Sequence, residues 1–187
     1  MCGALLLAAS VCATAQIEAA RAAFEKEDYA NAYRLFKPIA DQGSAEAQYR
    51  LGLMHKFGWG TERDHGAAAR WLRAAAEQSH GEAQAELAVY YKDGRGVKRD
   101  LAEAAGWFRK AAEQGVGIAQ LNLGRMYKDG SGVSKDLVEA YFWLSLAARQ
   151  GYMDALSHRS SIAEVMSAAD IKLAEARVDA RSAKKIK

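Results

Sequence analysis

The side chains of this sequence that could act as acids, bases or metal ligands are widely separated. The four histidines are His55, His65, His80 and His158, and no two of them have the H-x-x-x-H or H-E-x-x-H spacing of zinc sites. No serine lies in the G-x-S-x-G context of a hydrolase nucleophile. We therefore predict no catalytic residue, no metal ligand and no cofactor-binding residue, and classify the chain as a non-enzyme.

Two further patterns resemble functional motifs, but each recurs every 36 residues. Glu77 and Glu113 form such a pair, which indicates repeated surface charges and not an acid with its base. Gly-x-Gly occurs at 58–60, 94–96 and 130–132. A phosphate-binding loop needs a preceding strand and a longer glycine motif. We therefore predict that these glycines form turns at helix ends, where positive φ is required.

The interval of 36 residues is the dominant feature of the sequence. Three full copies fill residues 45–152. Self-similarity at this period is typical of stacked repeats, in which each unit is a helix pair. We predict the first helix of each pair, helix A, over 45–57, 81–92 and 117–128. The second helix, helix B, runs to about Gln78, Gln114 and Gln150.

Helix B has two recurring signals. An aspartate precedes each copy as an N-cap, at Asp64, Asp100 and Asp136. In the last two copies a glutamate three residues later, Glu103 or Glu139, would complete a capping box. A tryptophan then recurs beside alanine and leucine, at Trp71, Trp107 and Trp143. We predict that these tryptophans form the core between repeats.

The pattern divides the chain into four parts. Residues 1–15 read as a signal peptide, and 16–44 as an N-terminal helix pair with helices near 17–26 and 28–43. Residues 45–152 hold the three full repeats. Residues 153–187 hold a degenerate repeat and a capping helix that begins at Ser167 and ends in a basic tail. The fold class is therefore all-α, an α-solenoid of about five antiparallel helix pairs with a C-terminal capping helix.

The N-terminal segment predicts export. Residues 4–13 are apolar, uncharged and too short to span a bilayer, and Ala13-Thr14-Ala15 offers a cleavage site before Gln16. The alternative is a frayed first helix. Cys2 and Cys12 both fall in this segment, so a cleaved chain has neither disulfides nor a cysteine-based zinc site. Lipidation of Cys12 is a second alternative, although Val11 stands where lipoprotein signals have a small residue.

Charge argues against nucleic acid as a partner. The formal net charge is +3, but residues 177–187 hold five basic residues and one acid, so the rest of the chain is at −1. A short basic segment at a helix end is usually solvated and suits the helix dipole. We predict no nucleic-acid partner and, after signal cleavage, no transmembrane span.

The repeat resembles the Sel-one-like repeat family, which is related to the tetratricopeptide repeat, strongly over 28–152. The residues that carry the resemblance in one copy are Ala83, Gln84, Tyr91, Gly94, Gly96, Val97, Asp100, Trp107, Ala111, Ala112 and Gly115. The resemblance implies a right-handed superhelix used as an adaptor, often in the bacterial envelope, which suggests a periplasmic or secreted protein. Some exported relatives act on cell-wall or β-lactam substrates. These resemble cysteine-rich variants, and this sequence lacks their cysteines.

Positions at which the copies differ are the candidates for partner binding, since stacking already explains those that agree. By resemblance, helix A lines the inner face of such solenoids. The candidates are Trp59, His55, Tyr91, Tyr127, Arg50, Glu86 and Arg125. Trp59 is either an exposed anchor or a side chain folded back onto a neighbouring helix. We predict a monomeric, non-enzymatic scaffold that binds a protein or peptide in a concave groove. The alternative is a hydrolase directed at the cell wall or β-lactams.

Overall fold

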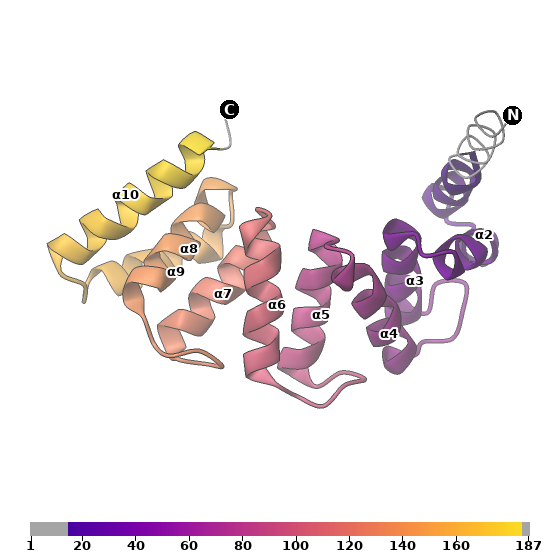
Figure 1. Cartoon of the computed structure of the whole chain (residues 1–187), viewed down its shortest axis with the longest axis horizontal. Coiled ribbons are helices and arrows are strands. Elements are labelled where there is room, and N and C mark those ends of the chain that lie inside the picture. Colours follow the sequence, from indigo (N-terminus) through magenta and orange to yellow (C-terminus); the bar gives the residue numbers. More distant parts are fainter. Residues whose placement is uncertain (1–14, 185–187) are drawn as a thin grey trace, which may run out of the picture. The chain divides into compact units, whose positions relative to one another are not determined.

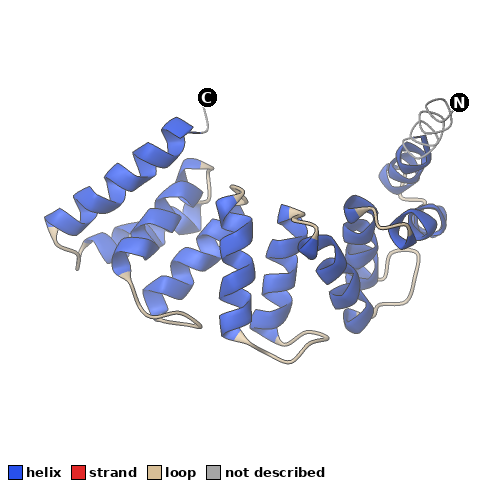
Figure 2. Cartoon of the chain, in the orientation of Figure 1, coloured by secondary structure: helices blue, strands red, loops and turns tan. Residues whose placement is uncertain are grey.

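The computed structural model of the chain describes residues 15–184, and every regular element in this range is a helix (Figures 1 and 2). Residues 15–25 are helical. The helices that follow are α2 (Tyr29–Asp41), α3 (Ala45–Phe57), α4 (His65–Glu77), α5 (Gly81–Asp93), α6 (Leu101–Glu113), α7 (Gly117–Asp129), α8 (Leu137–Arg149), α9 (Met153–Ala163) and α10 (Ala168–Lys184). The all-helical prediction is confirmed, with helix ends within about two residues of those expected.

The contacts divide the chain into two compact units. Unit 1 comprises residues 15–90 with Gly94–Lys98, and unit 2 comprises Tyr91–Asp93 with residues 99–184. In unit 1, α3 packs against both α2 and α4. In unit 2, α7 packs against α6 and α8, and α8 in turn packs against α9 and α10. Consecutive helices are thus packed in pairs within each unit, as the repeat requires.

The Gly-x-Gly loops are turns at helix ends, as predicted. Helices α3 and α7 end at Gly58 and Gly130, whose φ angles of 76° and 71° are left-handed. The second glycine is needed for a different reason. A Cβ on Gly132 would lie 2.1 Å from the carbonyl oxygen of Leu101, the first residue of α6. Each loop therefore ends one helix and also contacts the start of an earlier one.

The aspartate N-caps are confirmed, but the capping boxes are only half formed. The Asp136 side chain accepts a hydrogen bond from the Glu139 backbone N–H at 2.9 Å. The backbone N–H of Asp136 donates to the Tyr127 carbonyl at 3.0 Å and so does not meet the Glu139 carboxylate. That carboxylate accepts from Trp143 and Arg177 instead. The same backbone bond recurs from Asp64 and Asp100 in the earlier copies.

The prediction that the helix B tryptophans form the core holds only in part, and Trp71 packs against the core without being buried in it. Trp71 and Trp107 are half-buried, and only Trp143 is buried. The residues that follow them, Leu72, Phe108 and Leu144, are fully buried. The reason is that these residues face helix A: a Cβ on Gly52 would lie 2.8 Å from Leu72, and one on Gly124 would lie 2.7 Å from Leu144. Trp71 and Trp107 lie further round their helices, at the edge of the core.

The capping helix begins where predicted, since the Ser167 hydroxyl accepts from the Asp170 backbone N–H at 3.1 Å. The arginines of this helix contact α8. Arg177 bonds to Glu139 at 2.5 Å, and its guanidinium lies 4.6 Å from the Phe142 ring centroid. Asp179 on the same helix pairs with Arg149 of α8 at 2.6 Å. Some of the charged residues that we predicted to be solvated therefore hold α10 against α8 within unit 2.

Within the described residues, no helix is both long and apolar enough to cross a bilayer. The predicted signal peptide and Cys12 fall on residues 1–14, outside the described range.

Candidate functional site

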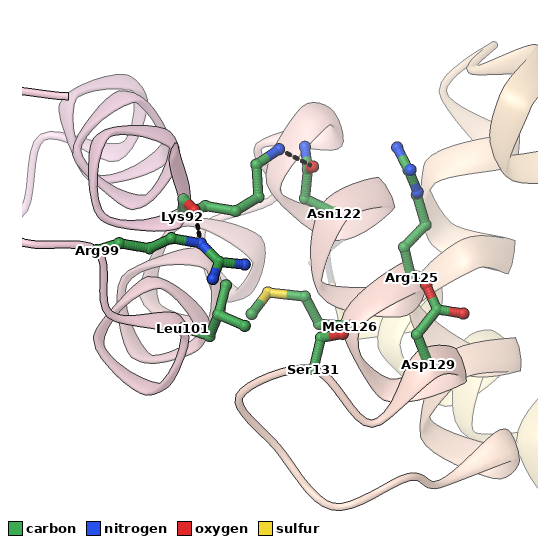
Figure 3. A pocket seen from close by; sticks show the side chains of 8 residues that line it. All are labelled: Lys92, Arg99, Leu101, Asn122, Arg125, Met126, Asp129 and Ser131. Carbon is green, nitrogen blue, oxygen red and sulfur yellow. Dashed lines mark hydrogen bonds between the residues drawn. The ribbon is translucent and has the colours of Figure 1, made fainter. Parts of the chain in front are cut away.

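The candidate site is a pocket of about 220 Å³ in unit 2, which we call the α7 pocket (Figure 3). It is lined by Lys92, Arg99, Leu101, Asn122, Arg125, Met126, Asp129 and Ser131. Asn122, Arg125 and Asp129 share one face of α7, because residues three and four apart are neighbours on a helix. Lys92 comes from the end of α5, and Arg99 from the loop that leads into α6.

The α7 pocket has an excess of positive charge. Three of its lining residues are basic, and Asp129 is the single acid among them. Lys92 Nζ lies 3.5 Å from the Asn122 side-chain oxygen and 4.0 Å from the Asp93 carboxylate, a loose contact. Asp129 is itself 3.8 Å from Lys128. The acids near the pocket therefore neutralise only part of its charge.

A backbone contact orients one of the basic groups, Arg99, and apolar groups lie beside it. Arg99 donates from Nε to the Lys92 carbonyl at 3.0 Å, a bond that Figure 3 shows as a dashed line. Leu101 and Met126 form the apolar side of the pocket. Arg125 is exposed on α7. This arrangement suits an anionic group on an aliphatic stem, because arginine and lysine donate charge-assisted hydrogen bonds to oxyanions.

One repeat earlier, in unit 1, the equivalent lysine is paired with a carboxylate and the position of Met126 holds a larger side chain. Lys56, the counterpart of Lys92, forms an ion pair of 2.7 Å with Glu86, which stands where unit 2 has Asn122. Tyr90 replaces Met126, and its fully buried side chain lies 3.3 Å from Nδ1 of His65. Burial raises the pKa of Tyr90 to about 12, so its hydroxyl stays neutral. In unit 1 the protein itself thus supplies a carboxylate to the lysine.

Trp59 is folded back, which decides between the two predicted alternatives. Its ring stacks on Tyr29 with centroids 5.3 Å apart and an interplanar angle of 11°. It also stacks on Phe57 at 4.4 Å and meets Phe24 edge-on at 5.6 Å. Its main contacts are therefore within unit 1, although the side chain is only half-buried.

The other candidates in unit 1 are also engaged within the protein. Arg50 places its guanidinium 5.4 Å from the Phe24 ring centroid. His55 packs edge-on against Tyr33, with Nε2 at 3.4 Å from the hydroxyl, and burial is the main cause that lowers its pKa. Glu86 is paired with Lys56.

In unit 2 the structure brings one predicted candidate, Arg125, into the pocket. Tyr127 accepts a hydrogen bond from Arg109 instead, and Tyr91 is half-buried on α5. The prediction missed Lys92 and Arg99, because both belong to patterns shared with the first copy, Lys56 and Arg63. The signal that could have identified them is the replacement of Glu86 by Asn122, which removes the partner of a recurring lysine.

Among the described residues, no group of three or more histidine, cysteine, aspartate or glutamate side chains could hold a metal ion.

Comparison with known proteins matches the chain to the Sel1 repeat family model at residues 23–44, 45–80, 81–116 and 117–152. One similar solved structure is a protective antigen of uropathogenic Escherichia coli with an SLR fold, at 39% identity and a TM-score of 0.74. Another is a Sel1 repeat protein from Oxalobacter formigenes, at 31% identity and a TM-score of 0.71. The matches cover 76% and 79% of this chain but 32% and 59% of those two chains.

A third similar structure is cysteine rich protein B of Helicobacter pylori, at 23% identity and a TM-score of 0.51, covering 74% of this chain and 92% of that one. At this identity the likeness shows the fold alone. No curated protein matches the chain.

Proposed function

Because the chain belongs to the Sel1 repeat family, whose repeats generally serve as protein-interaction scaffolds, we propose that it is a monomeric, non-enzymatic scaffold that binds a partner protein through unit 2. The observation that carries this proposal is the α7 pocket, in which Lys92, Arg99 and Arg125 line one opening with a single acid. Solenoid proteins typically bind partners along the faces of their repeated helices. The pocket lies on helix A, the row that the sequence predicted for partner contact.

Export to the bacterial periplasm is the second part of the proposal. It is supported by the apolar segment 4–13 and the small residues Ala13 and Ala15 around the expected cleavage site. Fractionation of cells that produce the full chain, followed by N-terminal sequencing, should give a periplasmic product that begins at Gln16. A full-length product confined to the cytoplasm would contradict export.

Site-specific photo-crosslinking tests partner binding. A photoreactive residue in place of Asp129, an exposed residue that lines the pocket, should give a defined protein adduct in cells. Gly106 of α6 provides the matched control, because it is exposed and a side chain there would meet nothing within 4 Å. Adducts of equal yield from both positions, or none from Asp129, would count against the scaffold proposal. Hydrolysis of a chromogenic β-lactam by the pure chain would count against its non-enzymatic part, and a dimer by light scattering against the monomer.

A further inference from the structure

We infer that the α7 pocket binds the carboxylate of a glutamate side chain presented by the partner protein, an inference that rests on the scaffold function proposed above. The argument comes from an internal comparison. Unit 1 and unit 2 hold the same lysine at the end of α3 and α5, but only in unit 1 does the next helix A supply a carboxylate that pairs closely with it. In unit 2 the lysine makes a loose contact with the Asp93 carboxylate at 4.0 Å. The pocket of unit 2 therefore lacks one glutamate that its counterpart contains.

The position of the missing carboxylate is given by Glu86. This glutamate of α5 bonds Lys56 at 2.7 Å, with both side chains largely shielded from solvent. Asn122 occupies the same register on α7 and offers Lys92 a neutral oxygen at 3.5 Å. An uncharged acceptor at this distance satisfies little of the hydrogen-bonding capacity of an ammonium group, which has three donors. A carboxylate from outside would form the stronger, charge-assisted bond.

Other differences between the copies open the pocket and add charge. Ser131 of unit 2 stands in the register of Trp59 and Arg95, so a small side chain replaces the large one of each earlier copy. Arg125 stands in the register of Leu53 and Val89, which adds a cation that neither earlier copy has. Ser131 leaves more space than Arg95 does but removes its charge, whereas Arg125 adds a cation. Together these changes leave an open pocket that is lined by three basic residues.

The pocket fits a glutamate better than a phosphate group. The Nε of Arg99 is occupied by the Lys92 carbonyl, which leaves the terminal nitrogens to grip two carboxylate oxygens. Leu101 and Met126 lie beside the position of the aliphatic stem. Asp129 also lines the pocket, and its charge would repel a phosphate dianion more strongly than a monoanion.

NMR titration of the full chain with blocked peptides tests this inference. The probes are acetyl-Ala-Ala-Glu-Ala-Ala-amide and the same peptide with glutamine in place of glutamate. We expect a dissociation constant of roughly 1 mM for the glutamate peptide, as suits a single anchored side chain, with shifts at Asn122 and Arg125. The glutamine peptide should bind at least tenfold more weakly. Equal binding of the two peptides, or tighter binding of inorganic phosphate or an oligonucleotide, would overturn the inference.

Two variants test the geometry. Asn122→Glu copies Glu86 and should reduce affinity for the glutamate peptide at least tenfold, because the protein then fills its own pocket. Arg125→Leu copies Leu53 and should weaken binding several-fold. Glu86→Gln, the matched change in unit 1, should leave binding in unit 2 unchanged. Wild-type affinity in both pocket variants would overturn the inference even if the peptide binds.

The crosslinking experiment separates this inference from the proposed function. Asn122→Glu combined with a photoreactive residue at Asp129 should lose the partner adduct. If the adduct persists at full yield, the scaffold function stands and the carboxylate inference fails. If no adduct forms even with Asn122 intact, the scaffold function itself fails.

Discussion

Units 1 and 2 are built on the same repeat but treat their charged residues differently. In unit 1, Lys56 pairs with Glu86, Arg21 pairs with Glu46, and the loop after α3 is closed by the Trp59 stack. In unit 2 the equivalent lysine meets Asn122, and the loop after α7 carries Ser131 beside an open pocket. The two units share the contacts of their backbones. They differ in the side chains that face the recurring lysine.

This difference separates basic residues that stabilise the repeat from basic residues that remain available to a partner. A basic residue paired within the chain contributes to the stability of its own unit and offers little to a partner. A basic residue without a close carboxylate partner retains more of its capacity for charge-assisted bonds. We therefore expect mutations of features that both units share to affect the two units alike, and mutations of the lysines Lys56 and Lys92 and their partners to affect them differently.

The largest expected effect tests the shared backbone contact. Gly60→Ala and Gly132→Ala would each place a Cβ 2.1 Å from a backbone oxygen, of Tyr29 or Leu101, at residues with positive φ. Each should lower the free energy of unfolding by about 3 kcal/mol or more, since strain and clash combine. Denaturant unfolding measures this. Gly106→Ala should instead stabilise the chain by about 0.5–1 kcal/mol, because nothing lies within 4 Å of its Cβ.

A marked difference between Gly60→Ala and Gly132→Ala would show that the two units do not share this contact energetically.

The second effect concerns the loop side chains. Trp59→Ala removes stacking on Tyr29 and Phe57 and should cost about 2–3 kcal/mol, less than for a fully buried tryptophan because Trp59 is half-buried. Ser131→Ala should change the free energy of unfolding by less than about 0.5 kcal/mol. Thermal and denaturant unfolding of both variants make the comparison. Equal losses would mean that Ser131 has a structural role that its contacts do not reveal.

The sequence predicted the scaffold well, because helix ends and turns depend on local residues. Aspartates at N-caps and glycines with positive φ specify their conformation within a few positions, so Asp136 and Gly130 could be assigned from spacing alone. The burial of Trp71 and Trp107 was overestimated because a recurring aromatic residue identifies a helix face only approximately. Whether Trp71 or Leu72 lies deepest depends on how close α3 approaches, and Gly52 sets that approach.

The pocket could be predicted only in part, because it combines three segments. Arg125 was visible as a residue that breaks the repeat, but its neighbours Lys92 and Arg99 follow the pattern of the first copy. The availability of Lys92 depends on whether a carboxylate stands opposite it, 30 residues further along the chain, as Glu86 does for Lys56. Trp59 illustrates the converse, since it breaks the period and yet packs within unit 1.

The third effect measures the lysine pairs directly. A double-mutant cycle with Lys56→Ala and Glu86→Ala should give a coupling energy of about 1 kcal/mol, the upper range for partly exposed ion pairs. The same cycle with Lys92→Ala and Asn122→Ala should give a value near zero, because the contact is 3.5 Å and neutral on one side. A coupling energy in unit 2 as large as that in unit 1 would mean that Asn122 satisfies Lys92 as well as Glu86 satisfies Lys56.

The smallest expected effect is a difference in how the pKa values of His55 and His158 respond to charge. Burial is the main cause that lowers both pKa values. In unit 2, the charges of Lys128, whose Nζ lies 3.3 Å from His158 Nδ1, and of Arg125 lower the pKa of His158 further, whereas Asp129 and Asp154 raise it. A folded-state pKa below 6.5 means that the unfolded chain binds more protons in the window just below that pH, so stability falls as pH drops through it. Raising salt should move the pKa of His158 upward more than that of His55, because salt screens the charges but not the burial. Lys128→Gln should raise the pKa of His158, whereas Lys56→Gln should leave it unchanged. NMR titration of the imidazole protons measures both pKa values. A His158 pKa that responds neither to salt nor to Lys128→Gln would show that the charges of Lys128 and Arg125 are already neutralised by their acidic neighbours.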